Sequence, residues 1–384
     1  MIRGCYLKDS MGMCLKEERA AAFEWIPELV TVLEAASLIE LERGESKQLA
    51  TLFRTLGRPG LTIAKELGGE GVSATKLAQV LTWVGAHCPS LAVMMTMHHH
   101  TVAGMMAASR FFPDIQGLLS IIARDNLLVA SGFAEGRAQA NILESTLSVE
   151  KTAAGYVVNG SKKPCTMTHH FDVITFGVNY LDPEGQTHIG IGMGLADDPS
   201  IQRKPFWSVA HLQAADSNEV IFNNLLVPEP MMYFSKAVDN QLDDVQQGTG
   251  EHLFAIWFQL LASASYLGMA SALASRALAS NKGSQDDRAL LLIDLQGATM
   301  AIRGLAIAID QNRFLRSDLA RAQATRFAVQ EAINRISTRA FEILGGIAFM
   351  SSEEIAYLLV ATRVLAFHPT SRLASVPFLC EQLS

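Results

Sequence analysis

The sequence predicts an α+β fold in which a small β domain follows one helical region and precedes another. Three observations support this prediction: helical periodicity in the first third, short β-rich runs in the middle, and long helical patterns to the end. We expect an N-terminal helical domain over residues 1–125, a middle β domain over 126–230, and a C-terminal helical bundle over 231–384.

The first region reads as helical from about Glu17 to Arg124. Ala- and Leu-rich stretches such as Lys76 to Val84 have the composition of buried helices. Glycine and proline interrupt the pattern at Gly57 to Gly60 and at Gly68 to Gly71, where we expect turns.

The middle region changes to short runs rich in β-branched and aromatic residues. The runs are Gly155 to Gly160, Asp172 to Val178, Thr187 to Met193 and Glu219 to Phe222. Asn-Gly and Asp-Pro pairs separate them, and such spacing favours a compact antiparallel barrel or sandwich.

Three long helices are predicted after the middle region, over Glu251 to Ala279, Asp286 to Phe314 and Arg316 to Leu344. Their apolar stripes are wide enough to be buried on more than one side. We therefore expect a homotetramer or homodimer that assembles through the segments Phe254 to Ala279 and Asp286 to Ile309.

Composition excludes several classes of protein. Hydrophobic residues make up 49% of the chain and charged residues 18%, and the net charge of -7 without a basic run argues against nucleic acid as a partner. An apolar leader is absent and no stretch approaches the roughly 20 uninterrupted apolar residues of a membrane span, so we expect a cytoplasmic protein. The five cysteines are scattered without C-x-x-C spacing, so we expect neither zinc nor disulfides.

Several strings, in the correct order, resemble the acyl-CoA dehydrogenase superfamily over essentially the whole chain. They are Leu56-Gly57-x-x-Gly60-Leu61, Glu66-Leu67-Gly68-Gly69, Gly155-Tyr156-Val157-Val158-Asn159-Gly160, Glu219 to Pro228, and Phe341-Glu342-Ile343-Leu344-Gly345-Gly346. The resemblance implies a flavin, as FAD or FMN, between the β domain and the helical bundle. Gly345 and Gly346 are the candidate cofactor-binding glycines in the C-terminal region.

The chain departs from classical dehydrogenases at the catalytic base. Their carboxylate takes a proton from an acyl thioester, but the corresponding C-terminal position is His368, and the alternative position falls on or near Phe258. The family's Gly-Ser-Asp loop is replaced by Gly136-Arg137-Ala138. The segment that usually contacts the partner subunit's FAD is shortened, which leaves Lys282 as the candidate cation there.

A closer resemblance is to the oxygen-using branch, which includes dibenzothiophene monooxygenase. His98, Thr166 and His368 carry this resemblance, and it implies that they are catalytic. In this branch reduced flavin and O2 form a C4a-hydroperoxide, which needs a dry pocket with hydrogen-bond donors. Thr166 and Ser131 are then the residues expected to contact the flavin.

Each candidate also has a structural interpretation. His368 could end a helix, Thr166 could be an ordinary strand residue, Ser131 could close its own loop, and Lys282 could be a solvated lysine. The run His98-His99-His100 invites a metal, but neighbouring helical side chains point about 100° apart and cannot converge. We expect no metal, with His98 facing inward and the other two peripheral.

Two enzyme functions remain open, beside a non-catalytic flavoprotein. The first is a monooxygenase that receives reduced flavin from a separate reductase and acts on a small molecule. The second is a dehydrogenase that acts on a substrate bound as a thioester to CoA or to a carrier protein, with the His368 imidazole as its base.

Overall fold

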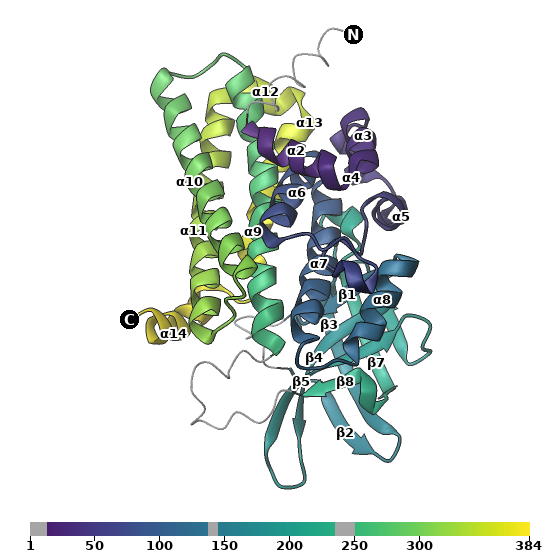
Figure 1. Cartoon of the computed structure of the whole chain (residues 1–384). Coiled ribbons are helices and arrows are strands. Elements are labelled where there is room, and N and C mark those ends of the chain that lie inside the picture. Colours follow the sequence, from purple (N-terminus) through teal and green to yellow (C-terminus); the bar gives the residue numbers. More distant parts are fainter. Residues whose placement is uncertain (1–13, 137–144, 235–249) are drawn as a thin grey trace.

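The computed structural model describes residues 14–136, 145–234 and 250–384. Long helices run side by side through one part of the molecule, and the strands gather at one end of them (Figure 1). This is the mixed architecture that the sequence predicts, with a C-terminal helical bundle and small sheets.

The N-terminal region is helical throughout. Its elements are α2 (Lys16–Trp25), α3 (Pro27–Ala35), α4 (Leu38–Arg43), α5 (Ser46–Leu56), η1 (Lys65–Leu67), α6 (Ala74–His87), α7 (Pro89–Ala108) and α8 (Ile115–Asp125). Proline at the first position starts α3 and α7, and the Ser73 hydroxyl accepts the N–H of Lys76 at the start of α6. Helix α7 is buried on nearly every side, because both helices and strands pack around it.

The middle region contains two four-stranded sheets. One has the order β1 (Val129–Gly132), β4 (Val173–Leu181), β5 (Thr187–Leu195), β8 (Met232–Phe234), and the other has the order β2 (Ser148–Thr152), β3 (Gly155–Cys165), β7 (Asn218–Val227), β6 (Ile201–Lys204). Pairs of named strands are antiparallel except β1 and β4, which are parallel, so the expectation of a purely antiparallel domain was wrong at this edge. Short 3-10 turns η2 (Gln213–Ala215) and η3 (Glu229–Met231) complete the region.

The C-terminal region is the bundle. It contains α9 (Gly250–Ala279), α10 (Gln285–Asp310), α11 (Arg316–Leu344), α12 (Gly346–Ser351), α13 (Glu353–Ala361), η4 (Thr362–Phe367) and α14 (Arg372–Leu383). Ser284 and Asp287 form a capping box that begins α10.

Helix α9 is the centre of the molecule and packs against α6, α7, α10 and α11. Two glycines permit this close approach. A Cβ on Gly85 of α6 would lie 2.2 Å from the Ser265 carbonyl oxygen, and one on Gly268 of α9 would lie 2.0 Å from that of Thr82. Larger residues at either position would force the helices apart.

Two of the described helices, α9 and α10, are long and apolar enough to cross a membrane by length and composition. The most apolar window of α9 is completely buried inside the fold, as a core helix would be. Only a third of the corresponding window of α10 is buried, so this helix exposes much apolar surface.

A buried carboxylate joins the three regions of the chain. Glu42 of α4 accepts the Ser90 N–H at 2.8 Å and the Ser90 hydroxyl at 2.5 Å, at the start of α7. It also accepts the hydroxyl of Tyr357 from α13, which in turn accepts the N–H of Leu212 beside η2 at 2.8 Å. Burial raises the pKa of Glu42, although these donors oppose the shift.

Candidate active site

A cluster of five side chains forms where α7, β1, α9 and the turn after η4 meet. We call His100, Ser131, Phe258, Tyr266 and His368 the histidine cluster. The His100 Nε2 atom lies 3.0 Å from the Ser131 hydroxyl, and the His368 Nε2 atom lies 2.9 Å from the Tyr266 hydroxyl. The Phe258 ring lies between the two imidazoles, with ring centroids 5.3 Å from His100 and 5.7 Å from His368.

Both imidazoles of the cluster are uncharged near neutral pH. Burial lowers the pKa of His100 to about 3. Burial, assisted by the nearby positive charge of Arg326, lowers the pKa of His368 to about 3 as well. Such rings can donate or accept hydrogen bonds, but they are weak bases, which argues against proton abstraction from a thioester by His368.

His98 has a different environment from the one the sequence suggested. Its Nδ1 atom accepts the N–H of Val129 at 2.9 Å, so Nε2 carries the proton and donates to the Pro59 carbonyl at 2.8 Å. Both nitrogens therefore hold the backbone, and His98 ties β1 to the turn after α5. Within the described structure it is His100, two residues later, that contacts the other candidates.

The expectation that His99 and His100 would be peripheral was wrong, since both are buried with His98. His99 packs against the ring of Phe53, and neither of its nitrogens has a hydrogen-bonding partner. The three rings point to different neighbours, and no group of three or more potential ligands among the described residues is arranged to hold a metal.

The two predicted hydroxyl residues lie on the β side of the site. Ser131 belongs to strand β1 rather than to a loop. Thr166 directly follows β3, and its hydroxyl lies 3.0 Å from that of Ser217. Both residues are buried, and the hydrogen bond of Thr166 leads to Ser217, not to the histidine cluster.

Lys282, Gly345 and Gly346 lie together at the other end of α9. The Lys282 ammonium donates to the Leu344 carbonyl at 3.2 Å, directly before the glycine pair. An α-helix rises about 1.5 Å per residue, so this group is on the order of 30 Å from Phe258. The structure therefore separates the predicted cofactor residues into two groups.

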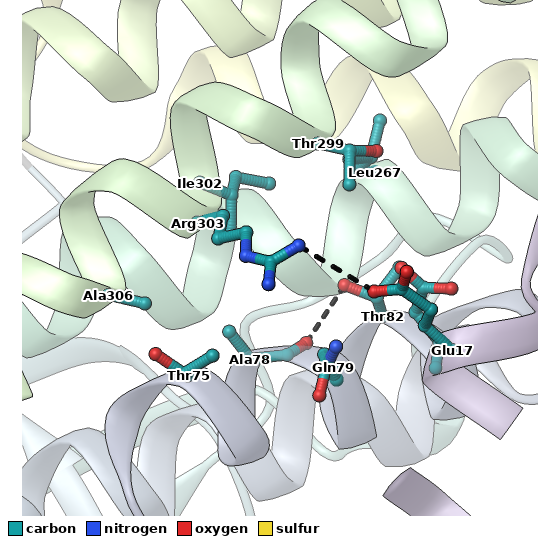
Figure 2. A pocket seen from close by; sticks show the side chains of 11 residues that line it. Glu17, Thr75, Ala78, Gln79, Thr82, Leu267, Thr299, Ile302, Arg303 and Ala306 are labelled. Atoms are coloured by element: carbon teal, nitrogen blue, oxygen red, sulfur yellow. Dashed lines mark hydrogen bonds and ion pairs between the residues drawn. The ribbon is translucent and has the colours of Figure 1, made fainter. Parts of the chain in front are cut away.

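Two hollows in the described structure lie outside the histidine cluster. One of about 40 Å³ is lined by α2, α6, α9 and α10, and Figure 2 shows Arg303 directed at Glu17 across it, 3.8 Å apart. The other, of about 420 Å³, is open and includes Trp257 and Arg110. Arg137 and Ala138, which replace the family's Ser-Asp pair, lie outside the described residues.

The chain is similar to characterised proteins over nearly its full length. It is 38% identical to isobutylamine N-hydroxylase of Streptomyces viridifaciens over 363 residues, which are 93% of this chain and 94% of the relative.

This chain belongs to the flavin-dependent monooxygenases of the acyl-CoA dehydrogenase superfamily.

Solved structures of other proteins share the fold. Nitrososynthase of Micromonospora carbonacea var. africana superimposes with a TM-score of 0.79 at 18% identity, covering 95% of this chain and 97% of that one. FMN-bound TdsC of Paenibacillus sp. A11-2 gives 0.77 at 16% identity, covering 96% and 97%. A search of protein-family models found no match.

Membership in this monooxygenase branch confirms the predicted monooxygenase activity and the predicted flavin cofactor. The residues present fit a flavin. A hydroxyl has one donor and two acceptor positions, so Ser131 and Thr166, which each have one side-chain partner among the described residues, retain capacity for a further hydrogen bond. Both belong to the β region, and Ser131 faces His100 of α7.

Proposed function

We propose that this monooxygenase converts a primary alkyl amine into the N-alkyl hydroxylamine. The balanced reaction consumes the amine, O2, two electrons and two protons, and yields the hydroxylamine and water. The observation that carries the proposal is the 38% identity to isobutylamine N-hydroxylase, which extends over both chains almost completely.

The histidine cluster suits this reaction. An amine reacts through its nitrogen lone pair, which exists only in the neutral free base. The uncharged imidazoles of His100 and His368 can accept a hydrogen bond from an N–H group without protonating the nitrogen. The apolar ring of Phe258 between them lowers the local polarity, and this also favours the neutral amine.

We propose that a separate reductase supplies the electrons as reduced flavin, which activates O2 when bound. The described part of the chain contains no βαβ unit of the kind that binds a nicotinamide dinucleotide, since its two sheets are almost entirely antiparallel. Reduced nicotinamide and flavin are cytoplasmic, and we propose the same location for this protein.

The test supplies the purified protein with isobutylamine, O2, FAD or FMN, and an unrelated flavin reductase with NADH. We expect a product heavier than the amine by one oxygen atom in mass spectrometry, with the label from ¹⁸O2. An acyl thioester added anaerobically to the oxidised flavoprotein should leave the flavin colour unchanged. Bleaching by the thioester, or no oxygenated product from a panel of alkyl amines, would contradict the proposal.

We also propose that two or more copies associate through α10. The predicted use of Phe254 to Ala279 was wrong, because that helix is buried within one copy. Along α10, by contrast, residues spaced alternately by three and four lie on one exposed face: Leu290, Ile293, Gly297, Met300, Gly304 and Ile307. A Cβ on either glycine would meet no atom within 4 Å, and Figure 1 shows α10 on the outer side of the bundle.

Replacing Ile293 by Glu should reduce the size of the assembly. Ile293 is 65% exposed in one copy, so burial against a second copy would make a charge there costly. Sedimentation should show a smaller species for Ile293→Glu at micromolar concentration. Leu181→Glu is the matched control, because Leu181 is 63% exposed at the end of β4, away from α10, and it should retain the native size. A monomeric native protein would contradict the proposal.

A further inference from the structure

The guanidinium of Arg326 is the most buried charge near the histidine cluster. It lies in the middle of α11 and has no exposed surface. Its Nε atom donates to the Gln259 side-chain oxygen at 2.5 Å, and its Nη2 atom donates to the Thr370 carbonyl at 2.5 Å. Its Nη1 atom lies 3.5 Å from the Leu365 carbonyl, and its Cζ atom lies 4.5 Å from the centroid of the Phe327 ring.

Every partner of this guanidinium that the structure describes is uncharged. Among the described residues no carboxylate lies within salt-bridge distance of Arg326. A buried charge loses several kcal/mol of hydration, and neutral acceptors recover only part of it. An apolar residue of similar volume would be the more stable choice at a purely structural position, so the stability of α11 does not explain the arginine.

The positions of its acceptors suggest another reason. Leu365 and Thr370 stand on either side of His368 in the chain, so two of the hydrogen bonds hold both ends of the short turn that presents the imidazole. Gln259 is the residue after Phe258 on α9, and the Phe258 ring contacts both histidines. The planar guanidinium of Arg326 therefore bridges the turn 365–370 and helix α9.

We propose that Arg326 is the positioning residue of His368, holding the turn 365–370 against α9 so that the imidazole meets Tyr266 and faces His100. Arg326 does not touch the reacting atoms in this arrangement. It acts through the orientation of His368. A displacement of a catalytic group by about 1 Å can lower the rate by about 10²-fold.

The first measurement requires neither cofactor nor substrate. In the flavin-free protein with ¹³C-labelled histidine, the His368 ring signal, assigned by its loss in His368→Ala, should shift and broaden in Arg326→Gln. Arg335→Gln is the matched control, since Arg335 lies on the same helix, is 53% exposed and pairs with Asp294. An unmoved His368 signal in a folded Arg326→Gln protein would overturn the proposal.

The second measurement is a double-mutant cycle on hydroxylation and on hydrogen peroxide release per reduced flavin consumed. Arg326→Gln should lower hydroxylation by about 10-fold to 10²-fold, and combining it with His368→Ala should add little to the loss from His368→Ala alone. Losses that multiply would show that Arg326 acts independently of His368.

Arg326→Lys separates geometry from charge and serves if Arg326→Gln does not fold. Lysine keeps the positive charge, but its single ammonium group lacks the planar arrangement of donors that reaches the acceptors on α9 and in the turn at the same time. We expect Arg326→Lys to show the displaced His368 signal, and Gln259→Met to show a smaller displacement in the same direction. Full native behaviour of Arg326→Lys would overturn the positioning role. The NMR measurement uses no amine. It therefore still tests the positioning role of Arg326 if the protein does not hydroxylate the proposed alkyl amines.

Discussion

Replacing His368 by alanine should reduce hydroxylation by about 10²-fold to 10³-fold, the usual worth of one preorganised hydrogen bond to a reacting atom. The hydroxyl of Tyr266 would lose its partner at 2.9 Å, and water would enter the space left by a half-buried ring. Flavin should still bind and reduced flavin should still be consumed by O2. The fraction that ends as free hydrogen peroxide should therefore rise.

The measurement compares product formed with hydrogen peroxide released for each reduced flavin consumed. His188→Ala is a suitable control, because His188 pairs with Asp182 in the β4–β5 hairpin and should leave the ratio unchanged. Tyr266→Phe removes only the phenolic hydroxyl and should give a smaller loss in the same direction. Native coupling in His368→Ala would show that His368 only ends η4.

Replacing Glu42 by alanine should destabilise the whole protein by about 3–5 kcal/mol, because the Ser90 N–H and the hydroxyls of Ser90 and Tyr357 would be left buried without an acceptor. Each such group costs about 1–3 kcal/mol. The free energy of unfolding from urea titration, monitored by circular dichroism, measures the effect. The flavin-free protein should be used so that ligand binding does not contribute.

Glu40 on the same short helix provides the matched comparison. Its side chain is exposed, so Glu40→Ala should change the free energy of unfolding by less than about 0.5 kcal/mol. Equal losses for the two variants would mean that α4 as a whole, and not the buried carboxylate, determines the stability. Glu42→Gln keeps one acceptor oxygen and should fall between Glu42→Ala and the native protein.

The order of helical and β regions could be predicted from the sequence because periodicity and turn residues are local properties. The choice among the three histidines of α7 could not. Periodicity identifies the inward face of a helix only when another face is polar, and α7 is buried nearly all round. The residues at 98 and 100 therefore look equivalent in sequence, although one holds the backbone and the other faces Ser131 and Phe258.

The contacts between the residues of the site could not be predicted from the sequence either. His368 meets Tyr266 across 102 positions of sequence, and only the packing of η4 against α9 brings them together. Arg326 is one of several arginines on α11, and its neighbours Arg321 and Arg335 are exposed. No pattern of charge or spacing distinguishes the buried one, because its acceptors are backbone carbonyls and a glutamine from other elements.

The central position of α9 makes the three regions poor modules for recombination. Its surface is covered on one side by α6 and α7 from the N-terminal region and on another by α11 from its own. A chimera that exchanges the N-terminal region with a relative must therefore match the glycine contacts at Gly85 and Gly268 and the acceptor at Glu42. An exchange of the β4–β5 hairpin avoids these contacts and should disturb the fold less.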